Sequence, residues 1–572
     1  MRSLGVRKFR ALLLVSCFSL GMDGLAEIID SSIAGHLLGA TALGAIGLFW
    51  PVIEFVYFVA FGLGGGSAVL YSTAAGSNDN REMSRVFSNG LLSALALGLL
   101  LTGALYALRD VIIASFGADA ATSAEAASYW NGYLANVALF PLYSYLSTMV
   151  TADGDERTAT IAFAAVFFAD TVLSFVLCRV LGIIGCAYGT VAGTVAGLAV
   201  LCFHFRRKSN SCRFRWFFSA RQAWRAFWAD LSESVNSLLA VVVYTFLGWS
   251  LTAWAGPSSL PVLTVVIATH GLMLFLYGVG SALRPVVSIY NAEGDVPAIR
   301  RVTRDAVCIS FLLGLALGAA LFACPRIPVW MVGLDDPALA EEASVAVRWI
   351  GAFYPCYSLV ILLISYYVFI GRRKLSMSLV LCLELVFPIA GGFVGNWLGG
   401  VHGFWVGYAL APALTLLAAM LPAVRSRRER PPFYLKPDAD SGFSDFSLVV
   451  EPKAICEVSD AVRQKLEDQG ESVKVGIRAA MLVEETLMAV REVNGARQCR
   501  CEVSLDVRES CARMILRDDG VVFELSHDTP GVEMIRGIVL GSTLKGLDDR
   551  FGYATLGLNR NVFVLRDGAS AG

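Results

Sequence analysis

Long apolar runs separated by short polar segments dominate the first 425 residues of the chain. A helix that crosses a bilayer needs about 20 mostly apolar residues, and by this rule the pattern predicts twelve spanning helices. Their approximate ranges are 9–32, 44–76, 84–107, 125–150, 158–180, 183–205, 223–254, 262–291, 303–324, 341–370, 375–397 and 402–422. The pattern therefore predicts an all-α polytopic membrane protein in this part of the chain.

The remaining residues have the alternation and polarity of a soluble α+β domain. The expected elements are a strand near 446–450, helices at about 453–469 and 474–493, and strands at about 499–508 and 511–517. Residues 426–442 are rich in charge, proline and turn formers, and we interpret them as a linker.

The membrane part contains an internal repeat. Five residues recur 216 positions later, namely Gly62, Gly64, Ser72, Asp79 and Arg85 as Gly278, Gly280, Ser288, Asp295 and Arg301. Many secondary transporters place a central substrate site between two such duplicated bundles. The predicted parts are a six-helix bundle at 1–205, a basic connection at 206–222, a second six-helix bundle at 223–425, the linker at 426–442, and a cytoplasmic domain at 443–572.

Composition and charge support this division and add an orientation. A mean hydropathy of +0.62 with 56% hydrophobic residues excludes an ordinary soluble enzyme. Basic residues concentrate in alternate loops, which predicts that both termini are cytoplasmic in a multi-pass plasma-membrane protein. This topology accounts for the basic residues, so we expect no nucleic-acid partner. The 13 cysteines have no CxxC spacing, and we expect neither a metal site nor a bound cofactor.

Six carboxylic acids fall inside the predicted spans. They are Asp23, Glu27, Asp30, Glu54, Asp170 and Glu384. An ionised carboxylate at the bilayer centre costs roughly 2.5–3.5 kcal/mol, so these side chains should face the bundle interior. A carboxylate there can take up a proton or a sodium ion on one side of the membrane and release it on the other.

Three segments resemble the MATE (multidrug and toxic compound extrusion) family. They are EIIDSSIAGHLLGATALGAIGLFWP from Glu27, GLGGGSAVLYSTAAGSNDN from Gly62 and LGIIGCAYGTVAG from Leu181. The resemblance covers about three quarters of the chain. It implies a V-shaped pair of six-helix bundles that exports amphipathic, often cationic compounds by antiport with H⁺ or Na⁺.

The same resemblance implies roles for particular residues. Asp30 matches the acid of the family's first helix, Asp170 matches an acid of the fifth, and Thr190 lies near a polar position of the sixth. We expect these three to couple the ion, and the other four acids to line a cavity. Val166 stands where the family often has an asparagine, which leaves the choice of ion open.

The soluble domain resembles the histidine-kinase-like ATPase fold in its anti-sigma-factor serine kinase version, but in a degenerate form. The segments that carry this resemblance are MLVEETLMAVREV, RDDGVVFEL and FGYATLGLN. The corresponding positions of the degenerate nucleotide site are Glu484, Met488, Asp518, Gly520 and Gly552. Met488 stands where the family has its magnesium-binding Asn, and Val522 replaces a Gly of the phosphate site. Neither side chain supplies an oxygen ligand. We therefore expect a regulatory domain without kinase or ATPase activity that contacts a cytoplasmic protein partner.

Two other functions fit the sequence. A lipid or glycan-precursor flippase of the same larger group would use cations along its cavity, for which Arg284 is the main candidate. A membrane-tethered sensor would use the helical body to detect a ligand and the soluble domain to signal.

Overall fold

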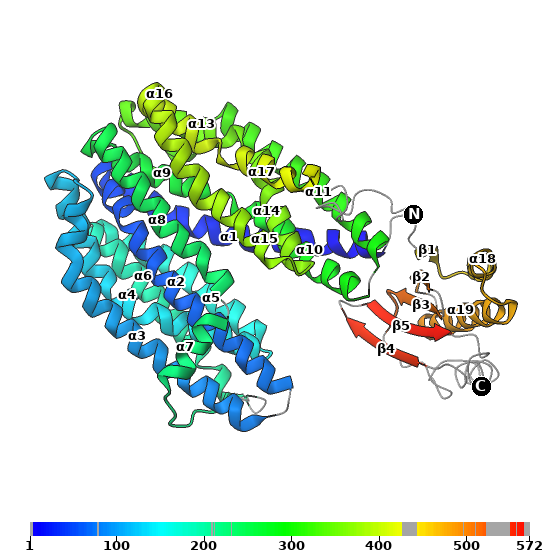
Figure 1. The fold of residues 1–572 in the computed structure, drawn as a ribbon. Coiled ribbons are helices and arrows are strands. Elements are labelled where there is room, and N and C mark those ends of the chain that lie inside the picture. The colour runs from blue at the N-terminus through cyan, green and yellow to red at the C-terminus, as the bar shows by residue number, and fades with distance from the viewer. Residues whose placement is uncertain are drawn as a thin grey trace.

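The computed structural model describes residues 4–76, 79–207, 210, 212–229, 231–293, 295–425, 443–495, 497–508, 511–521, 549–555 and 558–565. Helices form the part before residue 426, and a sheet with two helices follows from residue 443 (Figure 1). The predicted linker at 426–442 lies outside the described residues.

The first half of the membrane part consists of long helices joined by short turns. They are α1 (Leu4–Leu38), α2 (Ala40–Gly76), α3 (Asn80–Ser115), α4 (Ala120–Ala152), α5 (Glu156–Leu181) and α6 (Ile183–Leu201), followed by the turn η1 (His204–Arg206). Asp79, Asp119 and Asp155 begin α3, α4 and α5 by accepting backbone N–H groups of the first turn. Gly39 and Gly182 join neighbouring helices at φ values of 86° and 70°, which favour glycine.

The second half is more interrupted than the apolar pattern predicts. Its elements are α7 (Ala220–Ala229), α8 (Leu231–Trp254), η2 (Pro257–Ser259), α9 (Leu260–Gly271), α10 (Leu274–Glu293), α11 (Val296–Ala323), α12 (Arg326–Val332), α13 (Pro337–Ala352), α14 (Tyr354–Phe369), α15 (Arg373–Leu381), η3 (Cys382–Val386), α16 (Phe387–Ala409) and α17 (Ala411–Arg425). The run at 341–370 forms two helices bent by 53°, with Pro355 in the first turn of the second helix. Gly399 and Gly400 break α16 with non-helical dihedral angles, at the boundary predicted between the runs 375–397 and 402–422.

Eight helical segments among the described residues are long and apolar enough to cross a membrane, and the bent pair α13–α14 raises this number to nine. Helices α1 and α4, with 35 and 33 residues, also exceed the length that a bilayer requires. The chain is therefore a mostly helical multi-pass membrane protein. The layout of twelve spans remains a prediction.

The internal repeat corresponds to equivalent local structures in the two halves. Asp79 and Asp295 each cap the helix that follows, α3 and α11 respectively. Gly98 of α3 and Gly314 of α11 are also 216 residues apart. A Cβ atom on Gly98 would lie 2.4 Å from a backbone carbonyl oxygen of α4. A Cβ atom on Gly314 would lie 2.9 Å from a backbone carbonyl oxygen of α14. The same close helix contact therefore occurs once in each half.

Figure 1 shows two helical bundles that approach each other at one end and diverge toward the end where the N-terminus and the sheet lie. Where they meet, the Thr264 hydroxyl donates to the carbonyl of Leu43 at 2.6 Å. Helix α1 contacts both bundles. Its first half packs on α10 and forms a salt bridge from Arg10 to Asp305 of α11, whereas its second half reaches α5 and α6.

The C-terminal domain is a five-stranded antiparallel sheet in the order β1-β2-β3-β5-β4. Its elements are β1 (Phe443–Val449), α18 (Pro452–Asp468), α19 (Val473–Asn494), β2 (Arg500–Arg508), β3 (Cys511–Asp518), β4 (Asp549–Thr555) and β5 (Leu558–Leu565). Helices α18 and α19 cover one face with an apolar core that includes Leu482, Val503 and Leu516. Each element predicted here lies within a few residues of an observed one.

Candidate functional site

The candidate ion site depends on close packing between α5 and α6. Four glycines on one face of α6 stand at intervals of four residues, namely Gly185, Gly189, Gly193 and Gly197. A Cβ atom on Gly189 would lie 2.4 Å from the backbone nitrogen of Ser174, and one on Gly193 would lie 2.9 Å from Cβ of Asp170. The absence of side chains on this face allows the two backbones to approach and brings Asp170 next to α6.

Asp30, Asp170 and Thr190 meet inside the first bundle, from α1, α5 and α6. Thr190 Oγ1 lies 3.5 Å from Asp30 Oδ2 and also hydrogen-bonds Asp170. The hydroxyl of Ser174 donates to Asp170 Oδ1 at 2.8 Å. The two carboxyl groups interact electrostatically, so the three residues expected to couple the ion form one polar cluster.

Helix α4 adds polar groups to this cluster that the sequence did not single out. Asn136 is buried and accepts a hydrogen bond from Thr194 of α6 at 2.7 Å. Asn136 also hydrogen-bonds Tyr133, which interacts electrostatically with both carboxyl groups. Val166 of α5 instead faces Gly197. The amide near the cluster therefore comes from α4 rather than from α5.

Because the contact at Gly189 involves backbone atoms, replacing Gly189 with Ala should separate α5 from α6. Overpacking of this kind costs about 1–3 kcal/mol, and we expect a lower melting temperature in detergent together with reduced transport. Gly103→Ala is the matched control, because a Cβ atom there meets no atom within 4 Å. Equal melting temperatures for the two variants would contradict the close packing.

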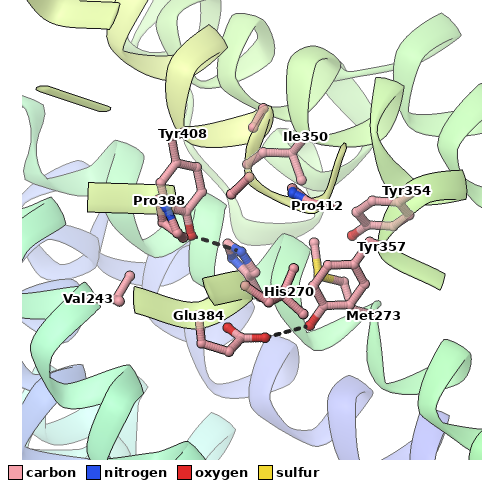
Figure 2. Close-up of a pocket in the computed structure, with 13 residues that line it drawn as sticks. Val243, His270, Met273, Ile350, Tyr354, Tyr357, Glu384, Pro388, Tyr408 and Pro412 are labelled. Atoms are coloured by element: carbon pink, nitrogen blue, oxygen red, sulfur yellow. Dashed lines mark hydrogen bonds between the residues drawn. The ribbon is translucent and has the colours of Figure 1, made fainter. Parts of the chain in front are cut away.

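A second polar cluster lies in the other bundle around Glu384, which stands in the π-helical turn η3. Such turns often occur at functional sites in proteins. Tyr357 donates to Glu384 at 3.3 Å, and its hydroxyl lies 3.3 Å from that of Tyr277. Figure 2 shows that His270 and Tyr408 line the same pocket as Tyr357 and Glu384. The Tyr408 hydroxyl lies 3.1 Å from His270 Nε2.

The cavity between these side chains has a volume of about 40 Å³. A water molecule needs roughly 10–15 Å³ of such space, so the cavity has room for a few waters or one ion but not for a drug-sized molecule. His270 Nδ1 lies 2.9 Å from the carbonyl of Val266, which leaves Nε2 to accept from Tyr408. The one sequence signal that could have indicated His270 is that it is a lone histidine inside an apolar run.

Three predicted cavity acids remain, namely Glu54, Asp23 and Glu27. Glu54 of α2 hydrogen-bonds Ser237 of α8, at a contact between the bundles. Asp23 and Glu27 are helical in α1, but their side chains lie outside the described part of the structure. Arg284 places its guanidinium 5.7 Å from the centre of the Phe369 ring.

In the C-terminal domain, two of the predicted nucleotide-site positions lie together. Gly520 N–H and the amide of Asn559 both donate to Asp518 Oδ1, at 3.0 and 2.8 Å. Burial raises the pKa of Asp518 to about 6, although these two hydrogen bonds act in the opposite direction. Met488 packs against the apolar core, and Gly552 pairs with Asn561 in the sheet.

The remaining predicted position, Glu484, is half-buried in α19. Residues 522–548, which form most of the segment between β3 and β4, lie outside the described residues. The likeness to an ATPase fold therefore remains a prediction.

The sheet face opposite α18 and α19 is polar, yet it is buried against the helical body. Glu502, Ser504 and Arg517 alternate with apolar core residues along β2 and β3, and each is 0% exposed. Arg517 Nη2 lies 2.6 Å from Glu293 at the end of α10 and 2.8 Å from Asp295. This alternation is typical of a solvent-facing side, so the cover over this face could not be predicted from the strand pattern.

Further ion pairs extend this interface. Arg301 of α11 contacts Asp445 at 2.9 Å and Glu502 at 3.3 Å, and Arg560 contacts Glu293 at 3.3 Å. Burial raises the pKa of Glu502 to about 7, against the opposing effect of Arg517 and Arg301. Asp295, the repeat counterpart of Asp79, is thus bound by the C-terminal domain.

Comparison with known proteins identifies the family. The family model MatE matches residues 16–177 and 234–394. A protein of Rhizobium meliloti named probable multidrug resistance protein NorM is 25% identical over 410 residues, which cover 66% of this chain and 85% of that protein.

Solved structures share the fold. One described as the inward-facing conformation of a multidrug resistance MATE family transporter aligns with a TM-score of 0.66 at 19% identity, covering 73% of this chain and 99% of that one. One described as the outward-facing conformation of such a transporter aligns with a TM-score of 0.57 at 21% identity, covering 73% and 96%. The family model matches more than half of the residues, in two blocks that follow the internal repeat. This chain therefore belongs to the MatE family of membrane transporters, and it is not an enzyme.

Proposed function

We propose that this transporter exports amphipathic, often cationic compounds in exchange for inward movement of H⁺ or Na⁺. The observation that carries the proposal is the meeting of Asp30, Asp170 and Thr190 inside one bundle. Two carboxyl groups in an apolar bundle repel each other when both are ionised. Binding of a cation relieves this repulsion and favours one conformation of the bundle. Release of the ion restores the repulsion and returns the bundle to the other conformation.

We place the N-terminus and the C-terminal domain in the cytoplasm, on the basis of the basic loops. The divergence of the bundles toward that side then corresponds to an arrangement open to the cytoplasm (Figure 1). The higher TM-score with the inward-facing structure supports this assignment. In this arrangement α1 packs along α10, and we propose that this contact loosens when the cytoplasmic side closes.

We further propose that the C-terminal domain regulates transport by contact and not by catalysis. Its polar face holds the turn between α10 and α11 through Arg517, and Asp519 reaches Arg7 of α1 at 3.5 Å. These contacts stabilise the arrangement in which α1 lies on α10. A cytoplasmic protein partner that competed for the same polar face would release the restraint.

The test is efflux of a fluorescent cationic dye from drug-sensitive cells that produce the full-length protein. The proton and sodium gradients are collapsed one at a time, and the gradient whose loss stops efflux identifies the ion. Efflux that survives the loss of both gradients would exclude antiport. Well-produced protein that exports no dye would favour the flippase or sensor functions.

A further inference from the structure

A buried cluster of metal-binding side chains lies at the end of the first bundle, away from both acid clusters. His204 of the turn η1 has a side chain only 2% exposed, between two aspartates of the α4–α5 turn. Its Nε2 lies 3.0 Å from Asp153 Oδ2, and its Nδ1 lies 2.9 Å from Asp155 Oδ2. Cys212, from the connection between the bundles, is buried beside them.

Each nitrogen of the imidazole ring faces a carboxylate oxygen. A neutral histidine has one N–H group, so its second nitrogen would present a lone pair to a carboxylate oxygen. A proton on that nitrogen or on the carboxylate removes this repulsion, and so does a cation that binds at one nitrogen while the other donates to its carboxylate.

The two nitrogens of His204 have different surroundings. The carboxylate of Asp155, on the Nδ1 side, is already held by the backbone N–H of Thr158 at 3.3 Å and by Arg207 at 2.6 Å. An oriented carboxylate on the far nitrogen is the usual support of a metal-binding histidine. The geometry therefore makes Nε2 the nitrogen that is free to bind a metal.

On the Nε2 side the ligand atoms of Asp153, His204 and Cys212 all lie within 4.8 Å of one another. Ligand atoms around tetrahedral zinc are separated by roughly 3.2–3.8 Å, so a small movement of Cys212 closes the set. The hydroxyl of Tyr71 lies 2.7 Å from Asp153 Oδ1 and 3.5 Å from Cys212 Sγ. The Tyr71 hydroxyl therefore lies beside two of these three residues.

We propose that Asp153, His204 and Cys212 bind a zinc ion that fastens the connection between the two bundles to the first bundle. A carboxylate, an imidazole and a thiolate are ligand types that zinc accepts, and three protein ligands leave the fourth tetrahedral position open. The charges also balance, since Zn²⁺ offsets Asp153 and the thiolate while Arg207 offsets Asp155. This site could not be predicted from the sequence, because its ligands come from three separate segments, with none of the short spacings of zinc motifs.

The test measures zinc directly and does not depend on transport, so its failure leaves the proposed function untouched. Full-length protein is purified, exposed to Zn²⁺, desalted and analysed by elemental mass spectrometry. We expect about one zinc ion per chain for the wild type, and at least tenfold lower occupancy for Cys212→Ser and His204→Gln. Cys202→Ser, which removes an exposed cysteine nearby, should retain the zinc.

Two results would overturn the proposal. Wild-type protein without bound zinc would show that this cluster does not hold the metal. Equal zinc content in wild type and Cys212→Ser would place the metal elsewhere. If Cys212→Ser fails to fold, the wild type and Cys202→Ser are loaded with Co²⁺ in place of Zn²⁺. Both should show the charge-transfer band of a cobalt–thiolate bond, and its absence would refute the site.

Discussion

Replacing Asp30 with Asn should reduce gradient-driven dye efflux by roughly 5–150-fold, the range expected when a coupling free energy of 1–3 kcal/mol is lost. Asparagine retains the size of the side chain but can neither bind nor release a proton. It also removes one of the two charges that would attract a sodium ion. The cluster with Asp170 and Thr190 then loses the response to the ion that drives the cycle.

The measurement is initial efflux rate normalised to the amount of protein in the membrane. Asp110→Asn is the matched control, because it makes the same chemical change at a side chain that is 80% exposed and pairs with Arg109. Asp170→Asn should behave like Asp30→Asn, since the two carboxyl groups belong to one cluster. Wild-type efflux in Asp30→Asn would remove Asp30 from the coupling mechanism.

Replacing Arg517 with Met should detach the C-terminal domain from the helical body. The substitution leaves Glu293, Asp295 and Glu502 buried without their shared cation. Breaking a buried ion pair by removing one partner costs roughly 3–5 kcal/mol. Hydrogen–deuterium exchange should therefore accelerate in the turn between α10 and α11 and along β2.

Two further variants make this result specific. Arg463→Met removes an arginine from a partly exposed pair with Glu467 on α18, and a surface pair of this kind contributes little to stability. Combining Arg517→Met with Asp295→Asn removes a buried charge that Arg517 had neutralised and should restore part of the protection. If the docked domain restrains α1, Arg517→Met should also export dye faster than the wild type. Unchanged exchange in Arg517→Met would show that the polar face does not hold the domain in place.

Much of the helical body could be predicted because a membrane helix is specified locally. Apolar runs of sufficient length indicate where the chain crosses the bilayer, and caps such as Asp79 and Asp295 are visible as polar residues between them. The breaks were harder to predict, because an apolar run has the same appearance whether or not the helix continues. The 53° bend between α13 and α14 and the π-helical turn at Glu384 depend on how the helices pack.

The sequence by itself determined the membrane character, the duplication, the elements of the C-terminal domain and the presence of acids within the apolar runs, because each depends on neighbouring residues or on a repeat along the chain. The tertiary structure alone decided which polar groups meet. It joined Asp30 to Asp170, added Asn136 from α4, and placed His204 between two aspartates. It also covered the polar face around Arg517, which alternation along the strands predicts to be solvated. Contacts between distant segments follow from the packing of the whole chain, so local pattern cannot specify them.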